Sequence, residues 1–265
     1  MSRIRGPLHR EVMGPEDGQP MLFIHANPMD SSSWMFQMAH FSSWYRCIAV
    51  DLPGYGRSPS VETGLTMDDV AVACWDAVDR STDRGDVVLV GCSVGSHVAQ
   101  RMYHLRPAAT NALVLVGAGW TPVKDFVPRR VADYRQHGLR FRYEHTLAGM
   151  SEEFAATPLA AWFAGMFVER NSTADLDTIV AMFEALGAPD PDWLQADLHA
   201  PVLIVAGSLD KVPAKQALQA RLPDARLVVI DGAGHACHME QPWAVDRAVV
   251  RFLRSCGHVH LPDVG

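Results

Sequence analysis

Three side chains that lie far apart in the sequence are of the types that nucleophilic catalysis requires. Ser93 is the centre of a Gly-Cys-Ser-Val-Gly pentapeptide, Asp210 ends Gly-Ser-Leu-Asp, and His235 ends Asp-Gly-Ala-Gly-His. A serine hydroxyl is a poor nucleophile at neutral pH, so it needs a base that takes its proton, and that base needs an acceptor that orients it. The three residues therefore predict attack by Ser93, proton transfer by His235 and orientation of the imidazole by Asp210.

Each of the three side chains follows an apolar run that predicts a buried strand. Apolar runs alternate with helical patterns along the chain, which is typical of βα units and a parallel sheet. The carboxyl ends of parallel strands share one edge of a sheet, so the three side chains are expected to converge there. We predict an α/β fold with a mostly parallel central sheet flanked by helices. The expected strands are 21–25, 46–50, 87–90, 111–117, 201–207 and 226–230, with 8–13 as a short edge strand.

The pattern changes between residue 120 and about residue 198. No β-branched run occurs there, and helical spacing appears at 126–140, 152–168 and 173–186. We therefore predict an all-helical cap at 120–198, inserted into a core made of residues 1–119 and 199–265.

Each catalytic candidate has an alternative interpretation. Ser93 is also compatible with a buried turn serine, and Asp210 with a cap for the helix expected to begin near Ala214. His238 competes with His235 for the role of base, but His235 directly follows the glycine turn. His238 is therefore expected on the wall of the cleft or at the surface.

Composition excludes several classes of partner and location. A formal net charge of −7 with scattered arginines argues against nucleic acid as a partner. No segment has the apolar length that crosses a bilayer, and no apolar region follows the basic N-terminal residues, so a cytoplasmic location is expected. No His-Glu-x-x-His pattern occurs, and neither a metal nor another cofactor is predicted. The expected partner is a small-molecule substrate, and a homo-oligomer stays open.

Five motifs in chain order resemble those of α/β-hydrolase-fold enzymes. They are His25-Ala26-Asn27-Pro28 and the segments 51–58, 87–95, 207–210 and 232–235, so the resemblance covers nearly the whole chain. It implies an oxyanion hole formed by the backbone N–H groups of Asn27 and Val94. The chain departs from the family at Ala26 and Ser96, where relatives commonly carry glycine. The family's other location for the acid, 117–119, offers no carboxylate, which favours Asp210.

The resemblance implies a serine hydrolase that cleaves a carboxylic ester or a lactone through an acyl-enzyme. Meta-cleavage C–C hydrolases and cofactor-free haloperoxidases share the same triad, and a small-molecule receptor on this fold is the non-enzyme alternative. Specificity is expected to lie in the cap. Trp120 is a candidate for the substrate pocket because it follows a strand end, and His25 is expected to brace its loop. An acid group on a C–C hydrolase substrate would call on cap arginines, for which the candidates are Arg129, Arg130 and Arg135.

Overall fold

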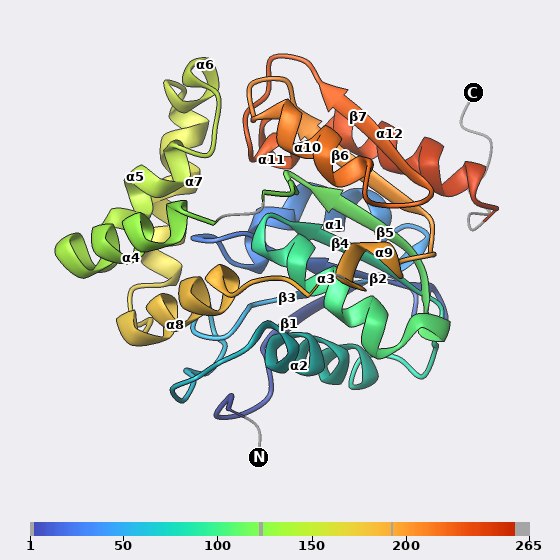
Figure 1. Cartoon of the computed structure of the whole chain (residues 1–265), viewed down its shortest axis with the longest axis horizontal. Coiled ribbons are helices and arrows are strands. Elements are labelled where there is room, and N and C mark those ends of the chain that lie inside the picture. The colour runs from blue at the N-terminus through green and yellow to red at the C-terminus, as the bar shows by residue number, and fades with distance from the viewer. Residues whose placement is uncertain (1–2, 122–123, 192, 258–265) are drawn as a thin grey trace.

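A seven-stranded sheet forms the centre of the molecule (Figure 1). The computed structural model describes residues 3–121, 124–191 and 193–257. The strand order is β1-β3-β2-β4-β5-β6-β7, and all neighbours pair in parallel except β1 with β3. The predicted α/β class and the edge strand are confirmed. The strands are β1 (Arg10–Met13), β2 (Gln19–Ile24), β3 (Tyr45–Val50), β4 (Val87–Cys92), β5 (Thr110–Val116), β6 (Val202–Gly207) and β7 (Ala225–Ile230).

Helices cover both faces of the sheet because successive strand residues point to opposite faces and both sets are apolar. In β2, Leu22 packs into the core on the α2 and α3 side, whereas Met21 and Phe23 pack into the core on the α1 and α12 side. The core helices are α1 (Met35–Phe41), α2 (Met67–Asp79), α3 (Val94–Leu105), α10 (Val212–Gln219), α11 (Cys237–Glu240) and α12 (Pro242–Ser255), with the short 3-10 helices η1 (Ser31–Trp34) and η2 (Pro107–Ala109).

The chain between β5 and β6 is helical wherever the structure assigns it a regular element. Most of these helices gather at one side of the sheet (Figure 1), where α5 packs on α7 and α4 on α8. The last of them, α9, returns to α3 of the core. They are α4 (Phe126–His137), η3 (Gly138–Phe141), α5 (Arg142–Leu147), α6 (Glu152–Ala155), α7 (Pro158–Arg170), α8 (Leu176–Gly187) and α9 (Trp193–Ala196).

The single helix expected at 152–168 was a wrong prediction, because the structure has two. Helix α6 ends at Ala155, and α7 begins at Pro158 with Thr157 as its N-cap, whose hydroxyl accepts the N–H of Ala160 at 3.2 Å. Proline is favoured in the first turn of a helix because that position has no N–H to satisfy. Apolar spacing continues across the break, so the helical period alone did not reveal it.

Candidate active site

Ser93 occupies a strained turn between β4 and α3. Its backbone has φ 52° and ψ −113°, and positive φ is uncommon for a residue with a side chain. The flanking glycines allow the turn, because a Cβ on Gly91 would lie 2.3 Å from the Gly95 carbonyl oxygen. A Cβ on Gly95 would lie 2.2 Å from the carbonyl oxygen of Ile24. The elbow therefore accepts only glycine at both positions, as the pentapeptide predicted.

Ser96 stabilises the elbow in a way that glycine cannot. Its side chain is fully buried, and its hydroxyl donates to the carbonyl oxygen of Gly91 at 2.8 Å. The N–H of Ser93 in turn donates to the carbonyl oxygen of Val116, at the end of β5, at 3.0 Å. The departure from the family pattern at Ser96 thus adds a hydrogen bond to the turn.

Asp210 and His235 lie in hydrogen-bond contact at the ends of neighbouring strands. Nδ1 of His235 donates to Oδ2 of Asp210 at 2.7 Å. Burial would raise the pKa of Asp210, but the hydrogen bond and charge of His235, followed by the charge of Lys215, lower it to about 2. An ionised carboxylate that accepts the Nδ1–H of the imidazole favours the tautomer in which Nε2 carries no proton. In this tautomer Nε2 can accept a proton, as a general base must.

Asp210 does not cap the following helix. Helix α10 begins at Val212, and its N-cap is Lys211, which makes no side-chain capping bond. The carboxylate of Asp210 instead receives a second donor, Nζ of Lys215, at 2.8 Å from the same Oδ2 that His235 contacts. The Lys215 side chain is only 5% exposed.

Sequence reasoning missed Lys215 as a partner of the acid. The only signal in the sequence is a lysine in the first turn of the helix that follows Asp210, and lysines in such a place normally point to solvent.

The imidazole of His235 lies against the strand end that holds Ser93. A Cβ on Gly117, the residue after β5, would lie 3.0 Å from both Cε1 and Nδ1 of His235. The preceding residue, Val116, accepts the N–H of Ser93. The candidate base and the backbone of the candidate nucleophile thus contact adjacent residues, Gly117 and Val116, at the end of β5.

His238 lies elsewhere. It is fully buried, and its ring centroid is 4.3 Å from that of Trp34. His238 was expected on the wall of the cleft or at the surface. The surface position is wrong, because α11 carries the side chain into the core. His235 is the histidine in contact with Asp210.

His25 braces the loop that follows β2, as expected. Its Nδ1 donates to the carbonyl oxygen of Ala26 at 2.9 Å, and its Nε2 accepts the N–H of Leu52 at 2.9 Å. Burial lowers the pKa of His25, which keeps the ring neutral and able to both donate and accept. This ring therefore joins the ends of β2 and β3.

The two candidate oxyanion donors belong to segments in close contact. The missing Cβ of Gly95 lets the start of α3 approach the carbonyl oxygens of Ile24 and His25, just before Asn27. The first amides of a helix, here from Val94 onward, have no acceptor within the helix. The Asn27 side chain is held by the hydroxyl of Tyr55, which donates to Oδ1 at 2.5 Å.

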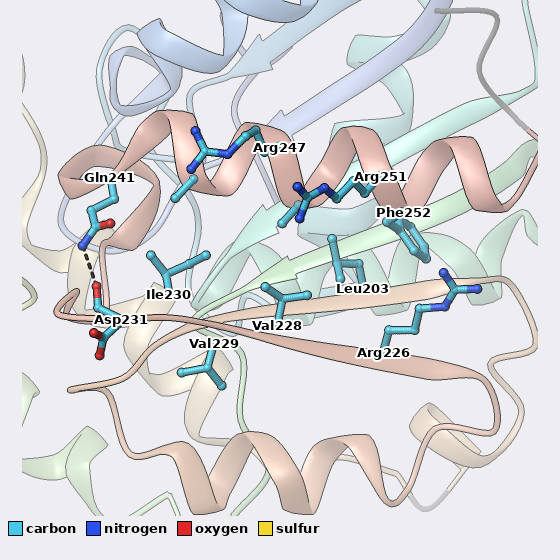
Figure 2. A pocket seen from close by; sticks show the side chains of 12 residues that line it. Leu203, Arg226, Val228, Val229, Ile230, Asp231, Gln241, Arg247, Arg251 and Phe252 are labelled. Atoms are coloured by element: carbon cyan, nitrogen blue, oxygen red, sulfur yellow. Dashed lines mark hydrogen bonds between the residues drawn. The ribbon is translucent and has the colours of Figure 1, made fainter. Parts of the chain in front are cut away.

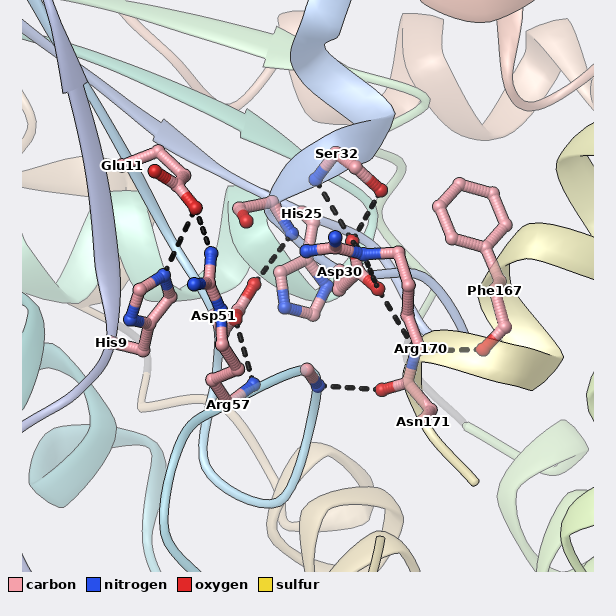
Figure 3. A network of polar contacts seen from close by, with 12 residues as sticks. His9, Glu11, His25, Asp30, Ser32, Asp51, Arg57, Phe167, Arg170 and Asn171 are labelled. Carbon is pink, nitrogen blue, oxygen red and sulfur yellow. Dashed lines mark hydrogen bonds and ion pairs between the residues drawn. The ribbon is translucent and has the colours of Figure 1, made fainter. Parts of the chain in front are cut away.

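Buried carboxylates tie the helices between β5 and β6, the region expected to be the cap, to the loops after β2 and β3 (Figure 3). Asp30 accepts from Nε of Arg170 and from Nδ2 of Asn171, each at 3.0 Å, and both donors lie at the end of α7. Asp51 accepts the backbone N–H of Ser31 at 2.8 Å and that of Arg57 at 2.9 Å. The network fixes the cap against the loop that carries Asn27.

The side-chain contacts described for Trp120 do not include the three catalytic candidates. Together with His97 and Lys124 it lines a small cavity of about 50 Å³. The catalytic candidates Ser93, Asp210 and His235 are not among the described residues that line this cavity. The guanidinium carbon of Arg221 lies 4.4 Å from the Trp120 ring centroid. Nothing in these contacts connects Trp120 with Ser93, so its place in a substrate pocket stays a prediction.

A larger cavity also lies outside the site. It has a volume of about 400 Å³ and opens between β7 and α12 (Figure 2), where Val228, Arg247 and Arg251 line it. The catalytic candidates are not among its described lining residues. In the part of the chain that the structure describes, no group of three or more metal-ligating side chains occurs, and no helix is long and apolar enough to cross a membrane.

The sequence matches the Alpha/beta hydrolase family over residues 21–261. The chain belongs to this family. It is 31% identical over 218 residues to the polyketide synthase ThaQ of Burkholderia thailandensis, covering 79% of this chain but only 10% of that protein. It is 24% identical to 3-oxoadipate enol-lactonase 1 of Acinetobacter baylyi, over 92% of this chain and 92% of that one.

Among solved structures, the fold is similar to that of a thermophilic esterase from Thermogutta terrifontis, with a TM-score of 0.79 and 25% identity. The alignment covers 97% of this chain and 98% of the esterase. The family and fold expected from the five motifs are confirmed.

Proposed function

We propose that this alpha/beta hydrolase cleaves a carboxylic ester or a lactone of a small molecule through a covalent acyl-enzyme. The observation that carries the proposal is the 2.7 Å bond from His235 to Asp210 on an imidazole that packs against Gly117, beside the strained turn of Ser93. Likeness to an esterase and to an enol-lactonase supports the same reaction class.

In the proposed reaction, Oγ of Ser93 attacks the substrate carbonyl while Nε2 of His235 accepts its proton. The negative charge on the carbonyl oxygen is stabilised by the backbone N–H groups of Asn27 and Val94. His235 then returns the proton to the leaving alcohol, and the acyl group remains on Ser93. Water, deprotonated by His235, attacks the acyl carbon, and collapse of the second intermediate releases the acid and restores Ser93.

The test is turnover of 4-nitrophenyl butanoate by the wild type and by Ser93→Ala. We expect Ser93→Ala to lose more than about a thousandfold in kcat, since removal of the nucleophile leaves only binding and the oxyanion donors. Ser172→Ala, a change at an exposed serine of the cap, is the matched control and should keep full activity. Undiminished turnover by folded Ser93→Ala would refute the assignment.

A panel of esters, lactones and vinylogous diketones separates the proposal from its alternatives. Preferred cleavage of the diketones would instead indicate a C–C hydrolase, and halide-dependent peroxide chemistry would indicate a haloperoxidase-like enzyme. A fluorophosphonate probe tests the remaining alternative. Labelling of Ser93 without turnover of any panel member would indicate a small-molecule receptor.

A further inference from the structure

Arg142 is a buried cation whose hydrogen-bonding capacity is only partly used. It is the first residue of α5 and its side chain is fully buried. Nη1 donates to the carbonyl oxygen of Pro28 at 2.9 Å, but Nε and Nη2 have no hydrogen-bond partner among the described residues. Buried guanidinium groups are normally paired, because an unpaired charge in the interior costs several kcal/mol.

The two unused donors form one edge of the guanidinium. Nε–H and the facing N–H of Nη2 are parallel, and this fork matches the two oxygens of a carboxylate. Nη1, on the other side of the group, is the donor that Pro28 occupies. The occupied bond thus fixes the orientation of the side chain and leaves its bidentate edge available.

The Arg142 guanidinium lies next to the loop proposed to hold the oxyanion. The Arg142 guanidinium carbon is 4.9 Å from the ring centroid of Tyr55, and the Tyr55 hydroxyl donates to Oδ1 of Asn27. Nδ2 of Asn27 is a further buried donor without a partner among the described residues, as is the hydroxyl of Thr146, one helical turn after Arg142. Tyr55 therefore contacts both Arg142 and Asn27, each of which has a buried donor without a partner among the described residues.

The described carboxylates nearby do not neutralise Arg142. Asp30 is bound by Arg170 and Asn171, and Asp51 by backbone N–H groups. His145, in the same helix as Arg142, accepts or donates at Nδ1 to the Tyr134 hydroxyl at 3.0 Å. Burial, then the charges of Arg130, His235 and Arg142, lowers the pKa of His145 to about 3. Among the described residues, no carboxylate therefore forms an ion pair with Arg142.

We propose that Arg142 binds a free carboxylate of the substrate, so that the enzyme prefers esters or lactones that carry an acid group near the scissile carbonyl. The inference rests on the proposed function and specifies its substrate class. A carboxylate at the Nε and Nη2 edge satisfies both donors at once and neutralises the buried charge. Burial between α5 and the Pro28 loop strengthens the interaction because water does not screen it.

Matched substrates test the preference. Mono-4-nitrophenyl glutarate carries a free carboxylate, and 4-nitrophenyl pentanoate has the same acyl chain with a methyl group in its place. Equivalent pairs based on succinate and adipate vary the number of carbon atoms between the scissile carbonyl and the free carboxylate. At the best chain length we expect wild-type kcat/KM to favour the acid by a factor of about 10 to 100, as for a buried charge-assisted bond. Rates measured with Ser93→Ala provide the background of spontaneous hydrolysis.

Variants assign the preference to one side chain. Arg142→Met should lower the acid-to-neutral ratio by about 10-fold or more, chiefly through KM for the acid. Arg140→Met, two residues away at an exposed arginine, is the matched control and should leave the ratio as in the wild type. Arg142→Lys keeps the charge without the planar fork and should lower the ratio severalfold.

An unchanged ratio at all three chain lengths in Arg142→Met would overturn the inference and leave Arg142 as a support for Pro28. If Arg142→Met loses its circular dichroism spectrum, the ratio measured with Arg142→Lys decides the question in its place. Calorimetric binding of glutarate to Ser93→Ala, compared with the same protein that also carries Arg142→Lys, measures carboxylate recognition without turnover. Failure of the serine mechanism therefore shows separately from failure of carboxylate binding.

Discussion

Three histidines, the fully buried His238 and the half-buried His97 and His145, are expected to make this enzyme sensitive to mild acid. Burial lowers the pKa of His97 to about 4 and that of both His145 and His238 to about 3, from an ordinary value of 6.5. Each ring therefore stays neutral in the folded protein while the unfolded chain takes up a proton. Stability is complete above the unfolded pKa of 6.5 and falls as the pH drops below it.

The magnitude follows from these pKa values. Between pH 7 and pH 5, linkage gives a loss of about 2 kcal/mol for each histidine, or about 6 kcal/mol for the three. Burial also lowers the pKa of His25, which adds to the loss, whereas burial raises the pKa of Asp246, which offsets part of it. Because the free energy of unfolding of a domain is about 5–15 kcal/mol, a loss of this size removes much of the stability of the protein.

His238→Phe isolates one of these contributions. The ring of His238 contacts that of Trp34 at a tilt of 35°, and neither of its nitrogens has a hydrogen-bond partner among the described residues. Phenylalanine therefore keeps the ring contact without the titration. Urea unfolding at pH 7, 6 and 5 gives the free energy of unfolding for both proteins. We expect equal or higher stability for the variant at pH 7, and a decline to pH 5 that is smaller by about 2 kcal/mol.

Parallel stability curves for the two proteins between pH 7 and pH 5 would refute this reasoning. They would mean that His238 is protonated in the folded state or that the unfolded state does not take up its proton normally. The amplitude of the urea transition and its m-value serve as the control, because a change in either would show that unfolding is not two-state.

Two further predictions concern the candidate acid. Asp210→Asn should lower kcat by a factor of about 1,000 to 10,000 with little change in KM, since asparagine donates to Nδ1 and favours the wrong imidazole tautomer; steady-state kinetics on 4-nitrophenyl butanoate would contradict this if kcat fell less than about tenfold. Lys215→Met should lower the free energy of unfolding by about 1–3 kcal/mol, because the buried Oδ2 of Asp210 loses a charged donor at 2.8 Å. Urea unfolding measures the loss, exposed Lys211→Met is the matched control, and equal losses in the two variants would speak against the contact.

Local sequence patterns were sufficient for the strands and for the turns that carry the candidate site. The run at 87–90 is apolar on both faces and ends in glycine, so it predicted a buried strand and a tight turn, which are β4 and the elbow of Ser93. Thr66 and Asp69 have the three-residue spacing of a capping box, and both bonds of that box are present at the start of α2. These features depend on interactions between residues only a few positions apart, so a short segment of sequence is enough to predict them.

The cap was predicted less well because helical spacing does not show which helices meet the site. Arg129, Arg130 and Arg135 were the candidates for holding the acid group of a C–C hydrolase substrate, with solvated helix positions as the default interpretation. The structure shows Arg130 bound to Asp133 and Arg135 near Glu184, whereas the buried arginine beside the Asn27 loop is Arg142. Sequence alone does not distinguish a buried arginine from a solvated one, since both occur at ordinary helical positions.

The sequence by itself determined the family, the order of the strands along the chain, and the residue types at three strand ends. Only the tertiary structure decided that Lys215 shares the oxygen of Asp210 with His235 and that Arg142 reaches Pro28, 114 residues earlier. The physical reason is that apolar period and glycine turns act within a segment, whereas the partner of a buried charge depends on how distant segments pack. Selectivity in this enzyme is expected to depend on that second kind of contact.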